Sequence, residues 1–512
     1  MKKRRVRVGA FFIPENRTKM VLFLAIKITM PVIVSAVWMK LPRAYAQPVT
    51  PYNVAAGTTA VIDKNTTINT DSASVYGQLT VDGGVLNETS TNTGSHKVGI
   101  IYVNGAAADN ALLTVQNGGS LVTVVGGNIV AGLETGTVGT LTATGAGSSL
   151  SSTFLQAGNY GDGTVNILNG ATATTNQTIL ANYVGTTGAL NLSGAGSTLT
   201  TDLLYVNGDG HGTVTIDSGA RAVVNAQVIF GSQGPGHGEL DVQNGGTLSV
   251  GRVNRIVDNE GPGGRYVFKL DNGTLEHIQS DPVTAGTINV VNTATIQTNS
   301  FVTGLFGVLY GTGGVTKEGS GTLLLTADNT YTGATTIAQG SLQLGLGGTT
   351  GSIASSVIHN NGMLVFNRSD TLGVAGAIDG TGNVVQAGKG TTVLSADNTY
   401  TGATTIMQGT LQLGNGGTTG GIASSAIHNG GTLVVDRSNT LALDGKIDGQ
   451  GNFVQAGKGT TVLSGDNTYT GATTIAQGTL QLGAGGTTGS ISASSAIHNN
   501  GTLAVDHSNT TV

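Results

Sequence analysis

A ten-residue segment that recurs at a fixed distance constrains this chain more than any other feature. Its sequence, Asp-Asn-Thr-Tyr-Thr-Gly-Ala-Thr-Thr-Ile, occurs unchanged at residues 328–337, 397–406 and 466–475. Equivalent residues lie 69 positions apart, as the step from 331 to 400 shows. A constant period of this kind indicates a stack of similar units, each packed mainly against its neighbours.

Three positions of this segment form its signature: an acidic residue, a tyrosine and a glycine. They are Asp328, Tyr331, Gly333; Asp397, Tyr400, Gly402; and Asp466, Tyr469, Gly471. Shortly after each copy two leucines flank a glutamine, as Leu411 and Leu413 flank Gln412. Apolar residues that alternate with polar ones predict a β-strand with one buried face.

A shorter unit precedes the long repeats. It begins with glycine, alternates apolar and polar residues, and in most copies closes on Ser-Gly or Asn-Gly. Its first glycines, at spacings of 24, 25, 24 and 26 positions, are Gly139, Gly163, Gly188, Gly212 and Gly238. Gly, Asn and Ser at the ends of each unit supply the left-handed backbone that corners need.

The two periods predict one fold, an all-β, right-handed parallel β-helix. Sixty-nine is three times 23, so we expect each long repeat to contain three coils close in length to the upstream unit. Coils of this size, with short strands and Gly or Asn corners, are typical of such solenoids. The 83 Gly lack the every-third spacing of collagen, and charged residues make up only 10% of the chain, which argues against disorder. A β-propeller is disfavoured because the single Trp lies in the N-terminal segment.

Residues 1–46 have the features of a secretory signal peptide with a long basic lead. A short apolar run follows the basic region, and Ala44-Tyr-Ala46 offers small residues for cleavage after Ala46. The alternative, a transmembrane anchor, normally needs about 20 apolar residues, and Lys27 and Pro31 interrupt the run. An exported chain without Cys has no disulfides, so its stability must come from packing and backbone pairing.

Beyond the signal, the patterns divide the chain into four segments. They are 47–110, the N-terminal part of the β-helix with its cap; 111–250, the coils marked by the glycine spacing; 251–310, an irregular connecting segment; and 311–512, the 69-residue repeats, truncated in the last copy. The first 46 residues hold 10 of the 23 basic and 1 of the 28 acidic residues, so the remainder has 13 basic and 27 acidic residues and a net charge of −14. An acidic body of this kind argues against nucleic acid as a partner.

Residues 311–345 resemble the passenger-associated repeat of type V autotransporters, and three copies extend to the end of the chain. The upstream units are similar to the degenerate coils of the same passengers. The resemblance implies export to the periplasm and passage through a C-terminal outer-membrane β-barrel translocator, which the barrel-assembly machinery inserts. It also implies folding outside, at the cell surface or in the medium. In this family the repeats are associated with secretion and folding of the passenger.

We expect no part of this sequence to form the barrel that the resemblance implies. Membrane barrels need strands of roughly 10 residues with an apolar outward face and aromatic girdles, whereas the chain stops within a Gly- and Thr-rich repeat. Expressed as given, the chain is therefore expected to be cleaved after Ala46 and to stay in the periplasm. It should then be protected from protease added to intact cells.

Several residues invite a chemical interpretation. His359, His428 and His498 occupy equivalent positions. Three coils would separate neighbours by about 14 Å, whereas zinc–nitrogen bonds are about 2 Å long, so we predict corner residues rather than metal ligands. Residues 382–390 superficially resemble a phosphate-binding loop, but the spacing is one residue too long and glycine follows the lysine. Two Gly-Asp-Gly sequences do not extend into a calcium-binding nonapeptide and are predicted to be turns.

Two functions follow as hypotheses. The leading one is a non-enzymatic passenger, without cofactor or metal, that acts as an adhesin or as a stalk and binds a host-surface or cell–cell ligand. Neither Gly-Asp-Ser nor Gly-x-Ser-x-Gly occurs to support a serine nucleophile. The alternative is a secreted β-helical enzyme that cleaves glycans as a lyase or hydrolase, which needs paired acids or acids with Arg or Lys. The plausible cluster for it is Arg252, Asp258, Glu260 and Arg265.

Overall fold

The computed structural model describes residues 51–70, 72–88, 100–106, 111–231, 236–251, 265–279, 283–284 and 286–508. All of them belong to one compact unit, Lys40–Val512. The predicted cleavage site at Ala44 and Ala46 lies outside the described residues. Among the residues described, none forms a helix long and apolar enough to cross a membrane.

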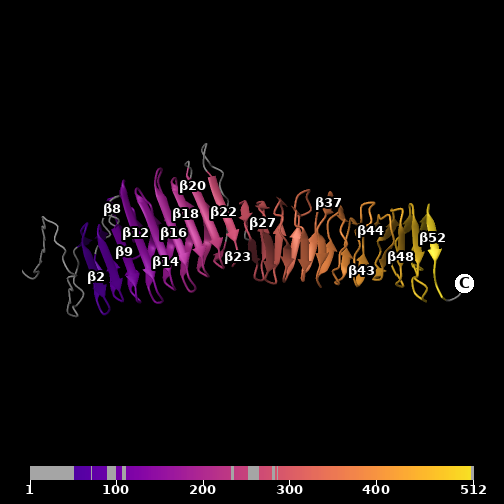
Figure 1. The fold of residues 1–512 in the computed structure, drawn as a ribbon, viewed down its shortest axis with the longest axis horizontal. Helices are drawn as coiled ribbons and strands as arrows, with labels where there is room; N and C mark the ends of the chain where they lie inside the picture. Colours follow the sequence, from indigo (N-terminus) through magenta and orange to yellow (C-terminus); the bar gives the residue numbers. More distant parts are fainter. Residues whose placement is uncertain are drawn as a thin grey trace, which may run out of the picture. The chain divides into compact units, whose positions relative to one another are not determined.

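The described residues form strands and no helix, and the strands stack as a parallel β-solenoid of about 18 turns (Figure 1). Strands are labelled β1 (Tyr52–Val54) to β52 (Thr502–Val505). Almost every pairing between these strands is parallel, and the antiparallel exception joins β8 (Gly105–Ala106) to β12 (Thr137–Thr144). The predicted fold class is therefore confirmed. Parallel pairing leaves each turn in contact with the turns before and after it.

The first half of the solenoid has the register that the glycine spacing predicts. Gly139 pairs with Gly163, Gly163 with Gly188, Gly188 with Gly212 and Gly212 with Gly238. The strands involved are β12, β14 (Asp162–Leu168), β16 (Thr187–Ser193), β18 (His211–Asp217) and β20 (His237–Gln243). The alternating apolar residues of these strands point inward, and Leu190 and Leu240 are fully buried. Left-handed backbone occurs at the corners as expected, for example at Asn169 with φ 55°.

The turns become shorter within the segment 251–310. Strand β22 (Arg265–Asp271) pairs with β20 at an offset of 28, from Gly238 to Tyr266, and with β25 (Ile288–Val290) at an offset of 20, from Lys269 to Asn289. The described part of this segment thus continues the ladders of both arrays. A change of turn length, rather than a break in pairing, explains why the sequence rhythm is lost here.

Three strands make one turn in the region of the long repeats. Strand β29 (Gly314–Glu318) pairs with β32 (Thr335–Ile337), β30 (Thr322–Leu325) with β33 (Ser341–Leu344), and β31 (Asp328–Asn329) with β34 (Ser352–Ile353). The paired residues are 20, 19 and 24 positions apart, respectively. In the first repeat each of these strands therefore pairs with the third strand after it, and the cross-section has three faces.

One long repeat does not contain a whole number of turns. The first repeat holds ten strands, from β29 to β38 (Ala377–Asp379), before β39 (Asn383–Gln386) begins the next copy. Ten strands at three per turn give three and one third turns, so the prediction of three equal coils is wrong. The turns are shorter here because their strands are shorter than those of the upstream coils, as β30 (Thr322–Leu325) is compared with β14 (Asp162–Leu168). Accordingly β29, β39 and β47 (Asn452–Gln455) belong to three different sheets, of 18, nine and seven strands. Successive repeats thus place equivalent residues on successive faces.

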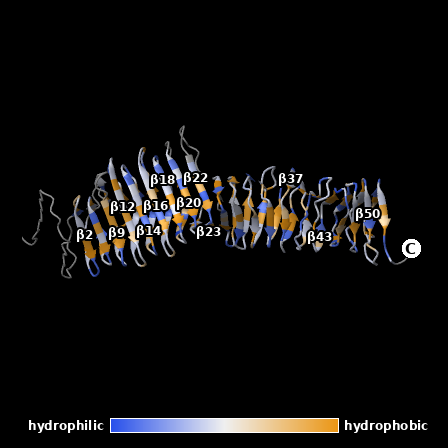
Figure 2. Cartoon of the chain, viewed as in Figure 1, coloured by the Kyte–Doolittle hydropathy of each residue, from blue (hydrophilic) through white to orange (hydrophobic). Residues whose placement is uncertain are grey.

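The core of the repeat region follows the predicted alternation. Leu411 and Leu413 are fully buried, whereas Gln412 lies on the outer surface, where its Nε2 donates to the Gly414 carbonyl at 2.9 Å. Figure 2 shows hydrophobic residues recurring in turn after turn along the strands. The predicted inside and outside assignment of these positions is confirmed.

Candidate functional site: the repeat-signature network

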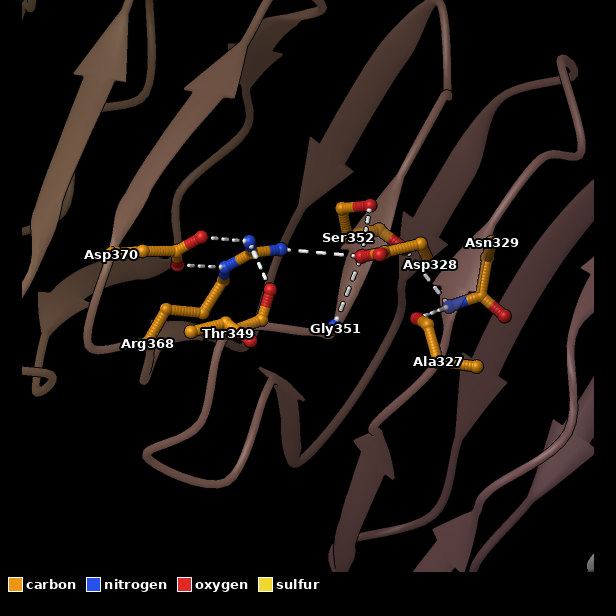
Figure 3. A network of polar contacts seen from close by, with 8 residues as sticks. All are labelled: Ala327, Asp328, Asn329, Thr349, Gly351, Ser352, Arg368 and Asp370. Atoms are coloured by element: carbon orange, nitrogen blue, oxygen red, sulfur yellow. Dashed lines mark hydrogen bonds and ion pairs between the residues drawn. The ribbon is translucent and has the colours of Figure 1, made fainter.

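The first signature residue, Asp328, joins its own turn to the two turns that follow. Its Oδ1 atom accepts hydrogen bonds from the backbone N–H of Gly351 at 3.1 Å and from the Ser352 hydroxyl at 2.8 Å. The same oxygen forms an ion pair with Nη1 of Arg368 at 3.2 Å (Figure 3). Because these partners lie 23, 24 and 40 positions later, one carboxylate holds three successive turns together.

Arg368 completes this connection, which we call the turn staple: Asp328, Arg368 and their equivalents in later repeats. The Arg368 side chain is only 9% exposed and binds both oxygens of Asp370 through Nε and Nη2, at 2.8 and 2.7 Å. Nη2 also donates to the Thr349 carbonyl. The guanidinium lowers the pKa of the Asp370 carboxyl. A bidentate contact of this kind fixes the geometry of the corner as well as neutralising the charges.

The second repeat contains the same staple. Asp397 Oδ1 accepts from the backbone N–H groups of Gly420 and Gly421 at 3.0 and 2.9 Å and pairs with Arg437 at 3.0 Å. Burial opposes ionisation of Asp397, but the hydrogen bonds from Gly421 and Arg437 outweigh it and lower its pKa. In the third repeat His507 occupies the place of the arginine against Gly483, so the staple varies between copies.

The residue after the signature aspartate is a buried asparagine that replaces backbone pairing. Asn398 Oδ1 accepts from the Ile378 N–H at 3.0 Å, while Nδ2 donates to the carbonyls of Ala396 and Gly421 at 2.7 and 2.9 Å. Asn329 and Asn467 make the same three bonds in their repeats. The amide thus satisfies backbone groups at a place where the strand ladder is interrupted, and burial without such bonds would be costly.

The signature tyrosines lie inside the solenoid. Tyr331, Tyr400 and Tyr469 are fully buried, and each hydroxyl bonds to the threonine four positions later at 2.6–2.7 Å. Burial raises the pKa of all three, that of Tyr469 to about 12. The ring fills the core at a corner while the threonine satisfies its polar end, which buried tyrosines require.

The signature glycines are needed because another turn passes close by. A Cβ atom on Gly333 would lie 2.4 Å from the carbonyl oxygen of Gly313 in the previous turn. A Cβ on Gly402 or Gly471 would lie 2.2 Å from the corresponding carbonyl oxygen. Any side chain at these positions would push two turns apart.

One further buried polar position holds a lysine in the first repeat and a glutamine in the second, and a second position changes with it. Lys317 is fully buried, and its ammonium donates to the carbonyls of Glu318, Gly319 and Gln339 at 2.7–3.0 Å. Burial lowers its pKa to about 8. The equivalent Gln386 donates to glycine carbonyls and also accepts a 2.6 Å bond from Thr392.

A second position, occupied by Thr392 where it bonds to Gln386, changes together with this one. The first repeat has Leu323 where the second has Thr392, because an ammonium needs no donor while an amide oxygen does. Sequence analysis did not single out the asparagines, Arg368 or Lys317. The joint exchange of Lys317 and Leu323 between otherwise similar repeats was the signal that could have revealed the buried contact.

The repeated histidines lie in strands, so their prediction as corner residues is wrong. They belong to β35 (Val357–Asn360), β43 (Ala426–Asn429) and β51 (Ile497–Asn499), in three different sheets. Nδ1 of His359 lies 2.8 Å from Asp379, and Nδ1 of His428 lies 2.9 Å from Asp448. Within the described part of the chain, no three His, Cys, Asp or Glu side chains gather as metal ligands would.

The residues that the sequence offers for a glycan-cleaving enzyme are not among those whose side chains the structure describes. Arg252, Asp258 and Glu260 lie outside the described residues, as does the side chain of Arg265. The network that the structure does describe consists of staples, buried amides and buried hydroxyls whose polar atoms are occupied by one another. Its chemistry is that of holding turns together.

Comparison with known proteins agrees with this architecture. A family model described as passenger-associated-transport repeat matches residues 315–344, 384–413 and 453–482, one match for each copy. The chain is also similar to the protein named adhesin BmaC autotransporter, from Brucella suis biovar 1 (strain 1330), with 32% identity over 207 residues. The repeats and the similarity indicate an autotransporter passenger domain. The match covers 36% of this chain and 6% of the Brucella adhesin, so the chain spans a small part of that protein's length.

Proposed function

We propose that this autotransporter passenger is exported through its signal peptide and acts at the cell surface, or after release, as a non-enzymatic adhesin or adhesin stalk. Cleavage after Ala46 and a C-terminal outer-membrane barrel, inserted by the barrel-assembly machinery, belong to the same proposal. The observation that carries it is the stack of three passenger-associated-transport repeats, continuous with the upstream coils through parallel strands. The similarity to an adhesin supports the binding role.

We further propose that the repeats assist secretion by folding readily outside the cell. Each staple joins residues no more than 40 positions apart, so it can form once three turns have come together. The entropy cost of closing such short loops is small compared with that of contacts between distant parts of a chain. Without Cys, these local contacts, the backbone ladders and the core fix one turn on the next.

Display on cells tests both roles. The chain would be joined to an autotransporter barrel in a Gram-negative host and treated with protease on intact cells. We expect a resistant surface-exposed passenger and attachment to host cells above that of cells carrying the barrel alone. The staple variant Asp397→Ala/Arg437→Ala should reduce the displayed amount, whereas the matched surface variant Thr399→Ala, at an exposed position near the staple, should not.

Each outcome bears on one part of the proposal. Equal display of the staple variant and the wild type would contradict the secretion role. Normal display without attachment would contradict the adhesin role. Cleavage of a polysaccharide that is lost on Arg252→Ala/Asp258→Ala would contradict the non-enzymatic role and favour the glycan-cleaving alternative.

A further inference from the structure

An exposed pair of tyrosines lies on the upstream half of the solenoid. Tyr160 and Tyr183 come from successive turns and stack with a centroid distance of 4.1 Å and an interplanar angle of 10°. They are 48% and 41% exposed, and the neighbouring Val184 is 66% exposed. Whereas Tyr331 fills the core of its turn, these two rings take no part in the core.

The tyrosines border a cleft that three glycines help to line. The cleft has a volume of about 270 Å³ and is lined by Gly136, Gly161, Gly185, Asp162 and threonines, besides both tyrosine rings. Glycines keep this part of the surface free of side chains, so that the rings stand beside open space. The remaining lining offers hydroxyls, one carboxylate and backbone groups.

A second cleft continues from the first along the same edge of the strands. Its volume is about 240 Å³, and it shares Asp162 and reaches His211 two turns later. The ring of His211 stacks on that of His237 at 4.8 Å. The two clefts thus form one groove across successive turns, with an aromatic pair near one end and an imidazole pair near the other.

The charge of the groove restricts what it can hold. None of the residues that line the two clefts is Lys or Arg, and Asp162 contributes the carboxylate. Phosphates, sulfates and acidic sugars would meet no cation among these lining residues, and Asp162 would repel them. A neutral ligand with many hydroxyl groups has complementary chemistry.

We propose that this groove binds a neutral oligosaccharide. The ring faces that Tyr160 and Tyr183 do not turn towards one another are negatively polarised and attract the C–H groups on the apolar side of a pyranose ring. Asp162 Oδ1 already accepts from the Thr187 N–H. The hydroxyls of Thr137 and Thr186 donate to backbone carbonyls. The second Asp162 oxygen and the lone pairs of these hydroxyls can still accept from sugar hydroxyls, directly or through water. Because the rings already restrain one another by stacking, little side-chain freedom is lost on binding. The step between turns is about 4.8 Å, so a groove over several turns suits a short saccharide chain rather than a single sugar.

The purified protein on an array of neutral and acidic oligosaccharides tests this proposal. We expect the wild type to bind neutral saccharides on the array. The affinity for such a saccharide, measured by calorimetry, should be at least tenfold lower for Tyr160→Ala/Tyr183→Ala. Tyr310→Ala, which removes a tyrosine that is 39% exposed outside the groove, is the matched control and should bind as the wild type does. Val184→Lys should also weaken binding by obstructing the rim, which provides a second test if the alanine variant folds poorly.

Three results would overturn the proposal: no saccharide binding by folded protein, unchanged affinity in both groove variants, or preference for acidic saccharides. The inference deepens the proposed adhesion role and rests on it. Because the assay uses purified protein, it can fail while cells that display the passenger still attach through another surface. Conversely, binding on the array would stand even if display in the Gram-negative host failed.

Discussion

Replacing Asn398 by alanine should open the solenoid locally at the start of the second repeat. The Ile378 N–H would lose its acceptor at 3.0 Å, and the Ala396 carbonyl would lose the donor at 2.7 Å. The Gly421 carbonyl would keep its bond to the backbone N–H of residue 398. A buried donor left without a partner costs roughly 1–3 kcal/mol and each lost hydrogen bond about 1 kcal/mol. We therefore expect a local destabilisation of roughly 2–4 kcal/mol.

Hydrogen exchange followed by mass spectrometry is the appropriate assay, because each turn of a solenoid contacts only its neighbours and the effect should stay local. Every 1.4 kcal/mol changes an equilibrium constant about tenfold. A loss of roughly 2–4 kcal/mol should therefore make peptides containing Ile378, residue 398 and Gly421 exchange about 30-fold to several hundred-fold faster. Peptides from the upstream coils should be unchanged. The control is Thr399→Ala, since Thr399 is exposed and adjacent. Equal exchange in Asn398→Ala and Thr399→Ala would refute the role assigned to the buried amide.

Three further predictions concern the core. Leu411→Asp should place a charge among buried side chains and cost several kcal/mol, whereas Gln412→Asp should be nearly neutral, so limited proteolysis should cut only the former. Lys317→Gln should destabilise its turn because the new amide oxygen lacks a donor, and adding Leu323→Thr should restore stability in thermal unfolding. Burial lowers the pKa of His277 to about 4. As the pH falls from about 6.5 towards 4, the unfolded chain therefore takes up a proton that the folded one does not. Stability around His277 should decrease over that range, and hydrogen exchange in His277→Leu should lack this decrease.

The sequence allowed the fold class, the strand register of the upstream coils and the inward positions to be predicted, because each rests on local alternation and regular glycine spacing. The glycines from Gly139 to Gly238 pair as their intervals require. The number of turns per long repeat was predicted wrongly. A period in sequence gives the distance between equivalent residues but not the number of corners between them, and here ten strands occupy a three-faced cross-section.

The signature network was predictable only in part. Recurrence marked Asp328, Tyr331 and Gly333, but their partners lie one or two turns away and depend on the turn length. The sequence alone does not identify Arg368 as the partner of Asp328. The contact depends on turns short enough to bring residue 368 next to residues 352 and 328. The histidines were also misplaced, because a histidine followed by asparagine can stand on the outer face of a strand, as in β35, as well as at a corner.

Cysteine pairs test the three-and-one-third-turn register most directly, because the chain has no native Cys. Val393 pairs with Gln412 in the neighbouring turn, 19 positions along the chain. Adjacent strands bring such residues to about 5 Å, within the range for a disulfide. Three equal coils per repeat would instead align Gln412 with Lys389. Mild oxidation of Val393→Cys/Gln412→Cys should give a disulfide-linked peptide by mass spectrometry, and Lys389→Cys/Gln412→Cys should not. Cross-linking of the 389/412 pair in place of the 393/412 pair would contradict this account.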